Sequence, residues 1–333
     1  MIISVDAMGG DFAPKETVLG ACKALRNSSN IEKMYLVGDK SQIESLIDED
    51  LKDRIEIIHT DTIIGMDEHP AQAYRSKRNA SICIASRLVK EGRADAVVSA
   101  GSTGAQLVAG LFEIGRIKGI KRPAIAVQLP SVTGPKILID AGANTDVDSL
   151  NLLQFAIMGK SFAEVLLNKS NNVKVGLLNN GSEETKGNTL TQESFSLLKN
   201  NTNIDFYGNI EGNEVLTAPI DVIVCDGFTG NILLKTMEGM GKTIFSTLKE
   251  EINSSLMYKI GALLLKPCLI NFKKNFDSKE VGGSPLLGLN GASIVCHGNS
   301  DARAFANGIR MAENCVKTNL VEKIKHNIME DSV

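Results

Sequence analysis

The sequence lacks the patterns that mark several classes of protein. Its six cysteines never form a Cys-x-x-Cys pair, and its four histidines show no ligand spacing, which argues for reduced thiols and against zinc. No apolar run reaches the roughly 18 residues that a membrane-spanning helix needs. No basic segment precedes the first apolar run, so we expect no signal peptide. We therefore expect a cytoplasmic protein that uses no metal and no other cofactor.

The composition is that of an ordinary globular protein without a strong charge bias. Hydrophobic residues make up 43% of the 333 residues and charged residues 23%, and the formal net charge is −3. A charge this small gives no electrostatic reason to expect nucleic-acid binding. A chain of this length can bury one large core, and we expect a single domain over residues 1–333.

Short apolar runs alternate with helical stretches along much of the chain. Apolar runs lie at residues 1–7, 34–37, 55–58 and 94–99, and helices are expected near 14–27, 41–47 and 81–91. Strands that alternate with helices are typical of a parallel sheet with helices on both faces. The pattern predicts an α/β protein, with three α/β/α layers and a mostly parallel sheet.

Two strand-to-helix turns share the pattern Gly-x-Thr-Gly. The apolar run at 222–225 ends in Asp226-Gly227-Phe228-Thr229-Gly230-Asn231, and the run at 95–99 ends in Ala100-Gly101-Ser102-Thr103-Gly104. A tight turn before a helix gathers free backbone N–H groups at the positive end of the helix dipole. A single turn of this kind is often only steric, but two copies favour a phosphate site if the loops face one another.

Further strand ends carry polar or glycine-rich turns, at residues 6–11, 140–144, 179–187 and 297–301. Ligands of open α/β sheets bind at such carboxyl ends, although each turn can also be purely structural. Lys186 is the only cation of its loop. The candidate substrate- and phosphate-binding residues are Asp6, Gly9, Gly10, Asp11, Gly101, Ser102, Thr103, Gly104, Asn144, Asp226, Gly227, Thr229, Gly230, His297 and Gly298.

Residues 256–276 combine an apolar helical stripe with many lysines. Leu256, Ile260, Leu263 and Leu264 lie on one helical face, and Pro267 interrupts the stripe. We expect a protruding helical hairpin, inserted at about 250–280. It either packs against a second subunit or lies on an anionic membrane, and both can hold. Leu263 and Leu264 are the expected membrane contacts.

Several motifs together resemble one enzyme family along almost the whole chain. They are VDAMGGD at 5–11, SAGSTGA at 99–105, GAN at 142–144 followed by Asp146, QFAIMG at 154–159 and CDGFTGN at 225–231. In this order they resemble the phosphate acyltransferase family PlsX. The family usually has asparagine where Ser102 stands and lysine where Val295 stands, so the roles of these two positions are not carried over.

The resemblance implies an activity, a fold and partners. It implies an acyltransferase that makes acyl phosphate from acyl-acyl carrier protein and inorganic phosphate, in phospholipid (phosphatidic acid) biosynthesis. It also implies an isocitrate/isopropylmalate dehydrogenase-like fold and a homodimer. A further expected partner is the membrane glycerol-3-phosphate acyltransferase that uses acyl phosphate. The expected location is cytoplasmic, with peripheral association at the inner face of the cell membrane.

Residue chemistry favours direct attack by phosphate on the thioester. Phosphate near neutral pH is largely dianionic, so it needs no strong base, and no Ser-His-Asp or Cys-His arrangement is evident. Asn231 and Lys186 are the candidate catalytic residues, for the oxyanion and for the departing thiolate. Two alternatives are an NAD-dependent decarboxylating dehydrogenase of the same fold and a non-catalytic membrane scaffold. The dehydrogenase would need an acidic metal cluster and an adenosine site, and neither is evident in the sequence.

Overall fold

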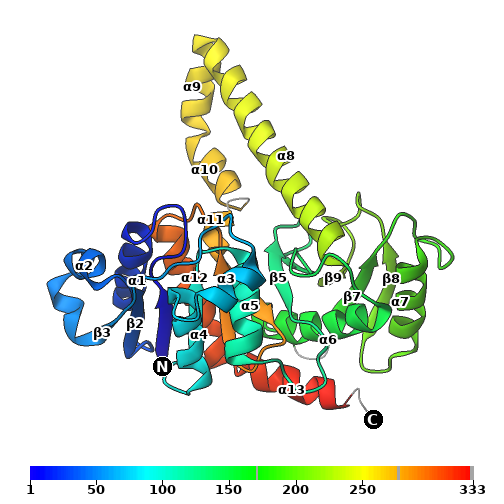
Figure 1. Cartoon of the computed structure of the whole chain (residues 1–333). Helices are drawn as coiled ribbons and strands as arrows, with labels where there is room; N and C mark the ends of the chain where they lie inside the picture. The colour runs from blue at the N-terminus through cyan, green and yellow to red at the C-terminus, as the bar shows by residue number, and fades with distance from the viewer. Residues whose placement is uncertain (170–171, 276–277, 331–333) are drawn as a thin grey trace.

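One large sheet organises the structure, a computed structural model that describes residues 1–169, 172–275 and 278–330. Its eleven strands lie in the order β3-β2-β1-β4-β11-β10-β5-β6-β9-β7-β8, and helices surround the sheet (Figure 1). The strands are β1 (Ile2–Asp6), β2 (Lys33–Gly38), β3 (Ile55–His59), β4 (Ala96–Ser99), β5 (Ala124–Leu129), β6 (Lys136–Ile139), β7 (Lys174–Leu178), β8 (Asp205–Ile210), β9 (Val222–Val224), β10 (Gly283–Leu287) and β11 (Ala292–Cys296).

The helices cover both faces of this sheet. Their bounds are α1 (Lys15–Asn27), α2 (Lys40–Ile43), α3 (Pro70–Ser76), α4 (Ser81–Lys90), α5 (Thr103–Ala109), α6 (Ser149–Leu166), α7 (Thr189–Asn200), α8 (Gly227–Ser254), α9 (Leu256–Leu264), α10 (Lys266–Asn275), α11 (Ser278–Val281), α12 (Ala302–Lys317) and α13 (Leu320–Glu330). One π-helical turn, Gly110–Ile114, continues α5.

The strands read as nearly continuous apolar runs because they are buried on both sides. In β4, Ala96 and Val98 belong to one hydrophobic cluster, whereas Val97 between them belongs to another. Successive side chains of a strand point to opposite faces, so the two clusters lie on the two faces of the sheet. The expected α/β class is confirmed.

The sheet is mostly parallel, with one antiparallel region between two parallel halves. β10 pairs antiparallel with β11 and β5, and β5 pairs antiparallel with β6. The other ladders, such as β1 with β4 and β6 with β9, are parallel. We call β3-β2-β1-β4-β11 the first half and β6-β9-β7-β8 the second half. The three successive antiparallel ladders reverse the strand direction between the first half and the second half, and the twist of the sheet adds a rotation of about 20° per strand.

The last part of the chain completes the first half. β11 lies parallel to β4, with Ala292 opposite Ala96, although the two strands are far apart in sequence. α12 packs beside α1, and a β-carbon on Gly20 of α1 would lie 2.9 Å from the β-carbon of Phe305. A larger residue at Gly20 would therefore push these two helices apart.

Helix α8 projects far from the sheet, and the chain returns through α9 and α10 (Figure 1). α8 has 28 residues, or about 42 Å at the usual rise of a helix. The chain reverses at Ser255, whose hydroxyl caps α9 by accepting a hydrogen bond from Met257 N–H. The outgoing arm is therefore α8, which begins at Gly227 and not near residue 250 as expected. Residues 276–277 of the expected segment lie outside the described residues.

The far ends of these helices expose large apolar side chains. Leu263 and Leu264 of α9 are 68% and 78% exposed, and Leu256 is 77% exposed. Pro267 lies in the first turn of α10, where its missing N–H costs no helical hydrogen bond. Among the described residues, no helix combines the length and the apolar content that crossing a membrane requires.

Candidate active site

The carboxyl ends of β1, β4 and β11 bring three predicted glycine turns into contact. A β-carbon added to Gly9 would lie 2.8 Å from the amide nitrogen of Gly101. Asp11 N–H donates to the Gly298 carbonyl at 2.8 Å, and Gly10 adopts φ +114°, which favours glycine. We call Gly9, Gly10, Asp11, Gly101 and Gly298 the first turn cluster. Three segments that are distant in the sequence thus form one surface.

Asp6 lies beneath this cluster and not on its surface. It is 2% exposed, and the Ser99 hydroxyl donates to its Oδ2 at 2.6 Å. The same hydroxyl accepts a hydrogen bond from Gly101 N–H at 3.0 Å. Burial raises the pKa of Asp6, while nearby donors that include Ser99 oppose the rise. Asp6 therefore holds the turn from below, and the expectation that it contacts substrate does not fit its position.

The helix that follows this cluster, α5, begins without a side-chain cap. Ser102 occupies the N-cap position, yet no capping hydrogen bond from its side chain occurs within the described part of the chain. Thr103 is exposed, and Gly104 packs against Pro70, where a β-carbon would come within 2.5 Å. The first N–H groups of a helix attract an anion when no cap satisfies them. The first N–H groups of α5 therefore have no side-chain cap among the described residues.

A second cluster forms where β6 and β9 end, around the buried carboxylate of Asp140. Asp140 is fully buried and accepts hydrogen bonds from the N–H groups of Ile125, Gly142, Ala143 and Asn144 and from the Asn144 side chain, at 2.8 to 3.1 Å. Burial raises the pKa of Asp140, and these donors oppose the rise. The carboxylate fixes the whole 140–144 turn.

Asn144 belongs to this scaffold. Its side-chain amide also donates to the Pro123 carbonyl at 2.7 Å, and the residue is 5% exposed. Its own carbonyl accepts the N–H of Gly227, the first residue of α8, at 2.8 Å. Asn144 therefore positions the start of α8 from inside, which differs from the expected contact with substrate.

The start of α8 is capped by its own aspartate. Asp226 accepts hydrogen bonds from the N–H and the hydroxyl of Thr229, at 2.8 and 2.7 Å. Two donors that were expected to bind phosphate are thus already engaged. Asn231, one turn into the helix, is exposed and lies over Gly142, where a β-carbon would approach its side chain to 3.4 Å. Its amide makes no hydrogen bond with any residue that the structure describes.

The two Gly-x-Thr-Gly turns therefore differ, and a matched pair of variants tests the difference. We expect Ser102→Ala to raise the KM for phosphate about tenfold, because it removes an uncommitted hydroxyl from an open helix start. Thr229→Val should leave this KM within about twofold and cost about 1 kcal/mol of stability through the weakened cap. Phosphate titrations and urea unfolding measure both. A large rise in KM for Thr229→Val would instead place phosphate at α8, as the sequence predicts.

Helix α8 joins the two clusters. It begins at the second cluster, and three turns later its Glu238 approaches Nε2 of His297, beside the first cluster, at 3.7 Å. The His297 side chain is half exposed. Burial and the charges of Lys235 and Lys242 lower the pKa of His297, against the opposing effect of Glu238. These effects together favour the neutral form of the imidazole.

Lys186 lies in the loop that leaves β7, the neighbour of β9. Its main chain is fixed, because its N–H donates to the Glu183 carbonyl at 3.1 Å and its carbonyl accepts from Asn179 at 3.2 Å. Its side chain is exposed and forms no ion pair with the residues described. No contact with Asn231 is found among those residues, so the two candidate catalytic groups are not joined directly in this structure.

Sequence reasoning missed the residues that support the turns from within. Asp140 ends a buried apolar run as Asp6 and Asp226 do, so this signal was available. The acid at Glu238 gave no local signal, because only the fold brings it to His297.

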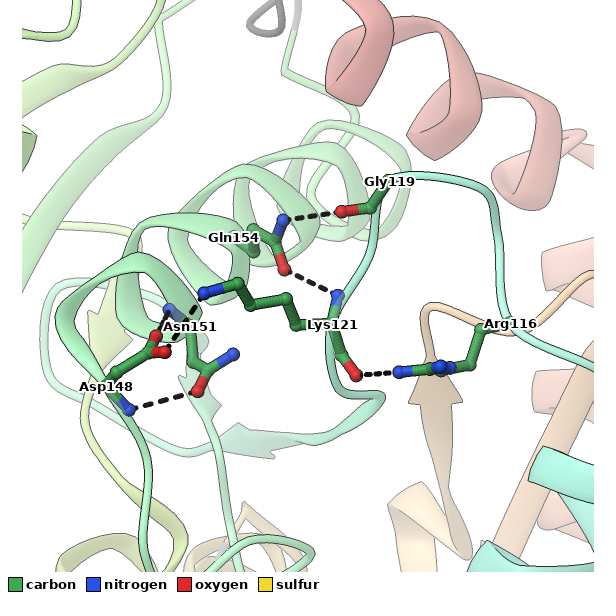
Figure 2. Close-up of polar contacts among 6 residues, drawn as sticks. All are labelled: Arg116, Gly119, Lys121, Asp148, Asn151 and Gln154. Atoms are coloured by element: carbon green, nitrogen blue, oxygen red, sulfur yellow. Dashed lines mark hydrogen bonds and ion pairs between the residues drawn. The ribbon is translucent and has the colours of Figure 1, made fainter.

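A third polar network, away from both clusters, ties α6 to the loop that precedes β5. Gln154 bonds to Lys121 N–H and the Gly119 carbonyl, and Lys121 pairs with Asp148 (Figure 2).

Comparison with known proteins agrees with this architecture. The chain is 49% identical over 327 residues to a protein named phosphate acyltransferase from Desulfitobacterium hafniense, covering 98% of this chain and 97% of that one. A branched-chain phosphotransacylase from Enterococcus faecalis has a similar structure, with a TM-score of 0.60, 15% identity and coverage of 95% and 99%. A 4-hydroxythreonine-4-phosphate dehydrogenase from Klebsiella pneumoniae reaches 0.50 at 12% identity, with coverage of 95% and 99%.

The chain is an α/β protein that places glycine turns at the ends of its strands. The Enterococcus phosphotransacylase and the Klebsiella dehydrogenase share this fold. The model of a family described as fatty acid synthesis protein matches residues 1–323. The chain belongs to this family, whose curated relatives are phosphate acyltransferases.

Proposed function

We propose that the chain is an acyltransferase that converts acyl-acyl carrier protein and inorganic phosphate into acyl phosphate, for phospholipid biosynthesis. The observation that carries the proposal is the 49% sequence identity to a phosphate acyltransferase over 98% of this chain. The glycine turn at Ser102, which no described side chain caps, adds to it. A dehydrogenase is not favoured, since the relatives at high identity have a different activity.

The proposed reaction is a direct displacement. A phosphate oxygen attacks the thioester carbonyl carbon, the carbon–sulfur bond breaks, and the carrier leaves as a thiolate. Phosphate brings its own negative charge, so the protein's work is to hold it against the carbonyl and to stabilise the oxyanion. In this proposal the first turn cluster and Ser102 hold phosphate. The Asn231 amide serves the oxyanion and Lys186 the departing thiolate.

Release of free thiol tests the activity. Purified protein, mixed with acyl-acyl carrier protein, should release thiol only when phosphate is added, and the product should react with hydroxylamine as acyl phosphates do. Failure of thiol release at any phosphate concentration would overturn the proposal. Protection from heat by NAD would favour the dehydrogenase alternative. An isocitrate/isopropylmalate dehydrogenase-like fold, without that chemistry, is part of the proposal.

We further propose that α8, α9 and α10 form a hairpin that binds an anionic membrane surface reversibly. Leu263 and Leu264 are more than two-thirds exposed, and apolar groups on a helix beside lysines suit the lipid interface. An acyl phosphate is amphiphilic, so its release at a membrane makes physical sense. There it would reach a membrane glycerol-3-phosphate acyltransferase. A homodimer is part of the same proposal.

Substitution of the two leucines tests membrane contact. Leu263→Glu with Leu264→Glu should abolish flotation with anionic vesicles, because it removes apolar burial and adds repulsion from lipid headgroups. Val132→Glu serves as the control, since Val132 is 81% exposed in the turn between β5 and β6, outside these helices. Wild-type binding should weaken as salt rises. If the double variant becomes monomeric or insoluble in size-exclusion chromatography, the leucines belong to a subunit interface instead.

A further inference from the structure

Lysines recur at heptad spacing along α8, at Lys235, Lys242 and Lys249. Residues seven apart in an α-helix lie nearly on one line, about 10 Å from each other. All three are exposed. We call them the lysine face of α8. Glu238 is the acid nearest to this line, and the remaining acids of the helix, Glu250 and Glu251, come after its last lysine.

The orientation of this face follows from the contacts of His297. Glu238, three residues after Lys235, approaches the imidazole at 3.7 Å, and the charges of Lys235 and Lys242 both act on His297. Residues 235, 238 and 242 occupy one side of the helix. The part of the lysine face at Lys235 and Lys242 is therefore turned toward the first turn cluster. Lys249 lies farther along α8, which leads away from the sheet (Figure 1).

The lysine face is incompletely neutralised. Lys235 pairs with Glu238 at 3.0 Å, but Lys242 and Lys249 form no ion pair with any residue that the structure describes. The exposed apolar residues Met240 and Ile244 lie on other sides of the helix. Two free ammonium groups, about 10 Å apart and in line with Lys235 beside the site, suit a large acidic partner better than a single small anion, which would use only one of them.

We propose that the lysine face of α8 is the docking surface for the carrier protein that brings the acyl thioester. This inference rests on the proposed function, which requires a protein-bound thioester to reach the turn clusters. The partner it fits is an acidic carrier protein whose carboxylates face Lys242 and Lys249. Its flexible thioester arm would pass His297 toward the site. Charge pairs between exposed surfaces such as the lysine face set the rate at which the two proteins meet and the dependence of that rate on salt.

Charge reversal on this face tests the proposal. Lys242→Glu should raise the KM for acyl-acyl carrier protein about tenfold, and Lys242→Glu with Lys249→Glu should raise it further, with kcat and the KM for phosphate nearly unchanged. Lys23→Glu is the matched control, because Lys23 is an exposed lysine within α1 that makes no ion pair with the described residues. The dissociation constant for the holo carrier protein, measured by fluorescence anisotropy, should follow the same order and weaken as salt rises.

The outcomes separate this inference from the proposed function. If wild-type protein releases thiol and the lysine variants keep both the KM and the dissociation constant for the carrier, docking on this face is overturned while the function stands. If wild-type protein releases no thiol, the function fails, and the anisotropy measurement still decides whether the carrier binds here. If the variants lose anionic-vesicle binding but retain carrier affinity, the face serves lipid and the docking proposal is wrong.

Discussion

Replacing Lys186 with alanine is expected to lower kcat about 100-fold, within the range for losing one electrostatic contact that forms in the transition state. The Lys186 loop leaves β7 next to β9, on the edge where α8 begins. Its ammonium is exposed, and no described residue neutralises it. A cation placed there can stabilise the charge that develops on the departing sulfur. Steady-state assays of thiol release measure the loss.

A neighbouring lysine provides the control for this experiment. Lys199 is exposed as well, but it pairs with Glu184 of the same loop at 2.6 Å. Lys199→Ala removes a surface ion pair, which is worth at most about 1 kcal/mol of stability and should leave kcat unchanged. Wild-type kcat in Lys186→Ala would make the loop structural. An equal loss in both variants would indicate a disordered loop and not a catalytic contact.

Removal of the Asp140 carboxylate is expected to be the most damaging change to stability among those considered. Asp140→Ala would leave five donors around an empty carboxylate position, three of them buried and two, the N–H groups of Gly142 and Ala143, partly buried. Unsatisfied buried donors cost roughly 1–3 kcal/mol each, and partial relaxation or water entry lowers the sum. We expect a loss of about 4 kcal/mol in the free energy of unfolding, measured by urea titration.

The loss of stability at Asp140 should depend on which carboxylate oxygen is removed, because the two oxygens accept from different donors. Asp140→Asn keeps the oxygen that serves Ile125, Gly142 and Ala143, but turns an NH2 group toward the donors of Asn144, so we expect a smaller loss. Asp146→Ala is the control, because Asp146 is exposed and makes no described contact, and it should change stability by less than about 0.5 kcal/mol. A loss below about 1 kcal/mol for Asp140→Ala would contradict the role that we assign to this carboxylate.

The sequence predicts the strands well because their burial is nearly complete. β1, β4 and β9 are short, mostly apolar runs that end at glycine turns, and both features are local. The strand order is not local. Nothing in residues 283–287 indicates that β10 separates β11 from β5 and runs antiparallel to both. That arrangement depends on which edges remain unpaired once the other strands are in place.

The projecting helices show a different limit. The helical character of residues 256–275 is evident from the sequence, but the position of the reversal is not. Residues 253–255 are Asn-Ser-Ser, which break a helix only weakly. The turn occurs there because Ser255 caps the next helix. Residues 227–254 thus form one continuous helix, α8, whereas the sequence predicts that a separate hairpin begins at about residue 250.

At the site, motifs identified positions better than roles. Gly9, Gly101 and Gly298 lie together because neighbouring parallel strands end at one edge, a grouping that the sequence alone did not specify. Asp6 and Asn144 were expected to touch substrate, yet both are buried beneath the turns. Burial depends on packing between segments that are far apart in the chain. The engagement of Thr229 by Asp226 was visible in principle, because an aspartate three residues before a threonine at a helix start is a capping pattern.

The insertion of β11 beside β4 also has a consequence for biosynthesis. β4 emerges from the ribosome well before its partner β11, because residues 100–291 are made between them. Until β11 is made, this edge of β4 lacks its native partner, and an unpaired apolar strand edge is a template for association between chains. Vectorial synthesis therefore exposes the edge of β4 while a long intervening segment is translated, a risk that the completed β4–β11 ladder removes.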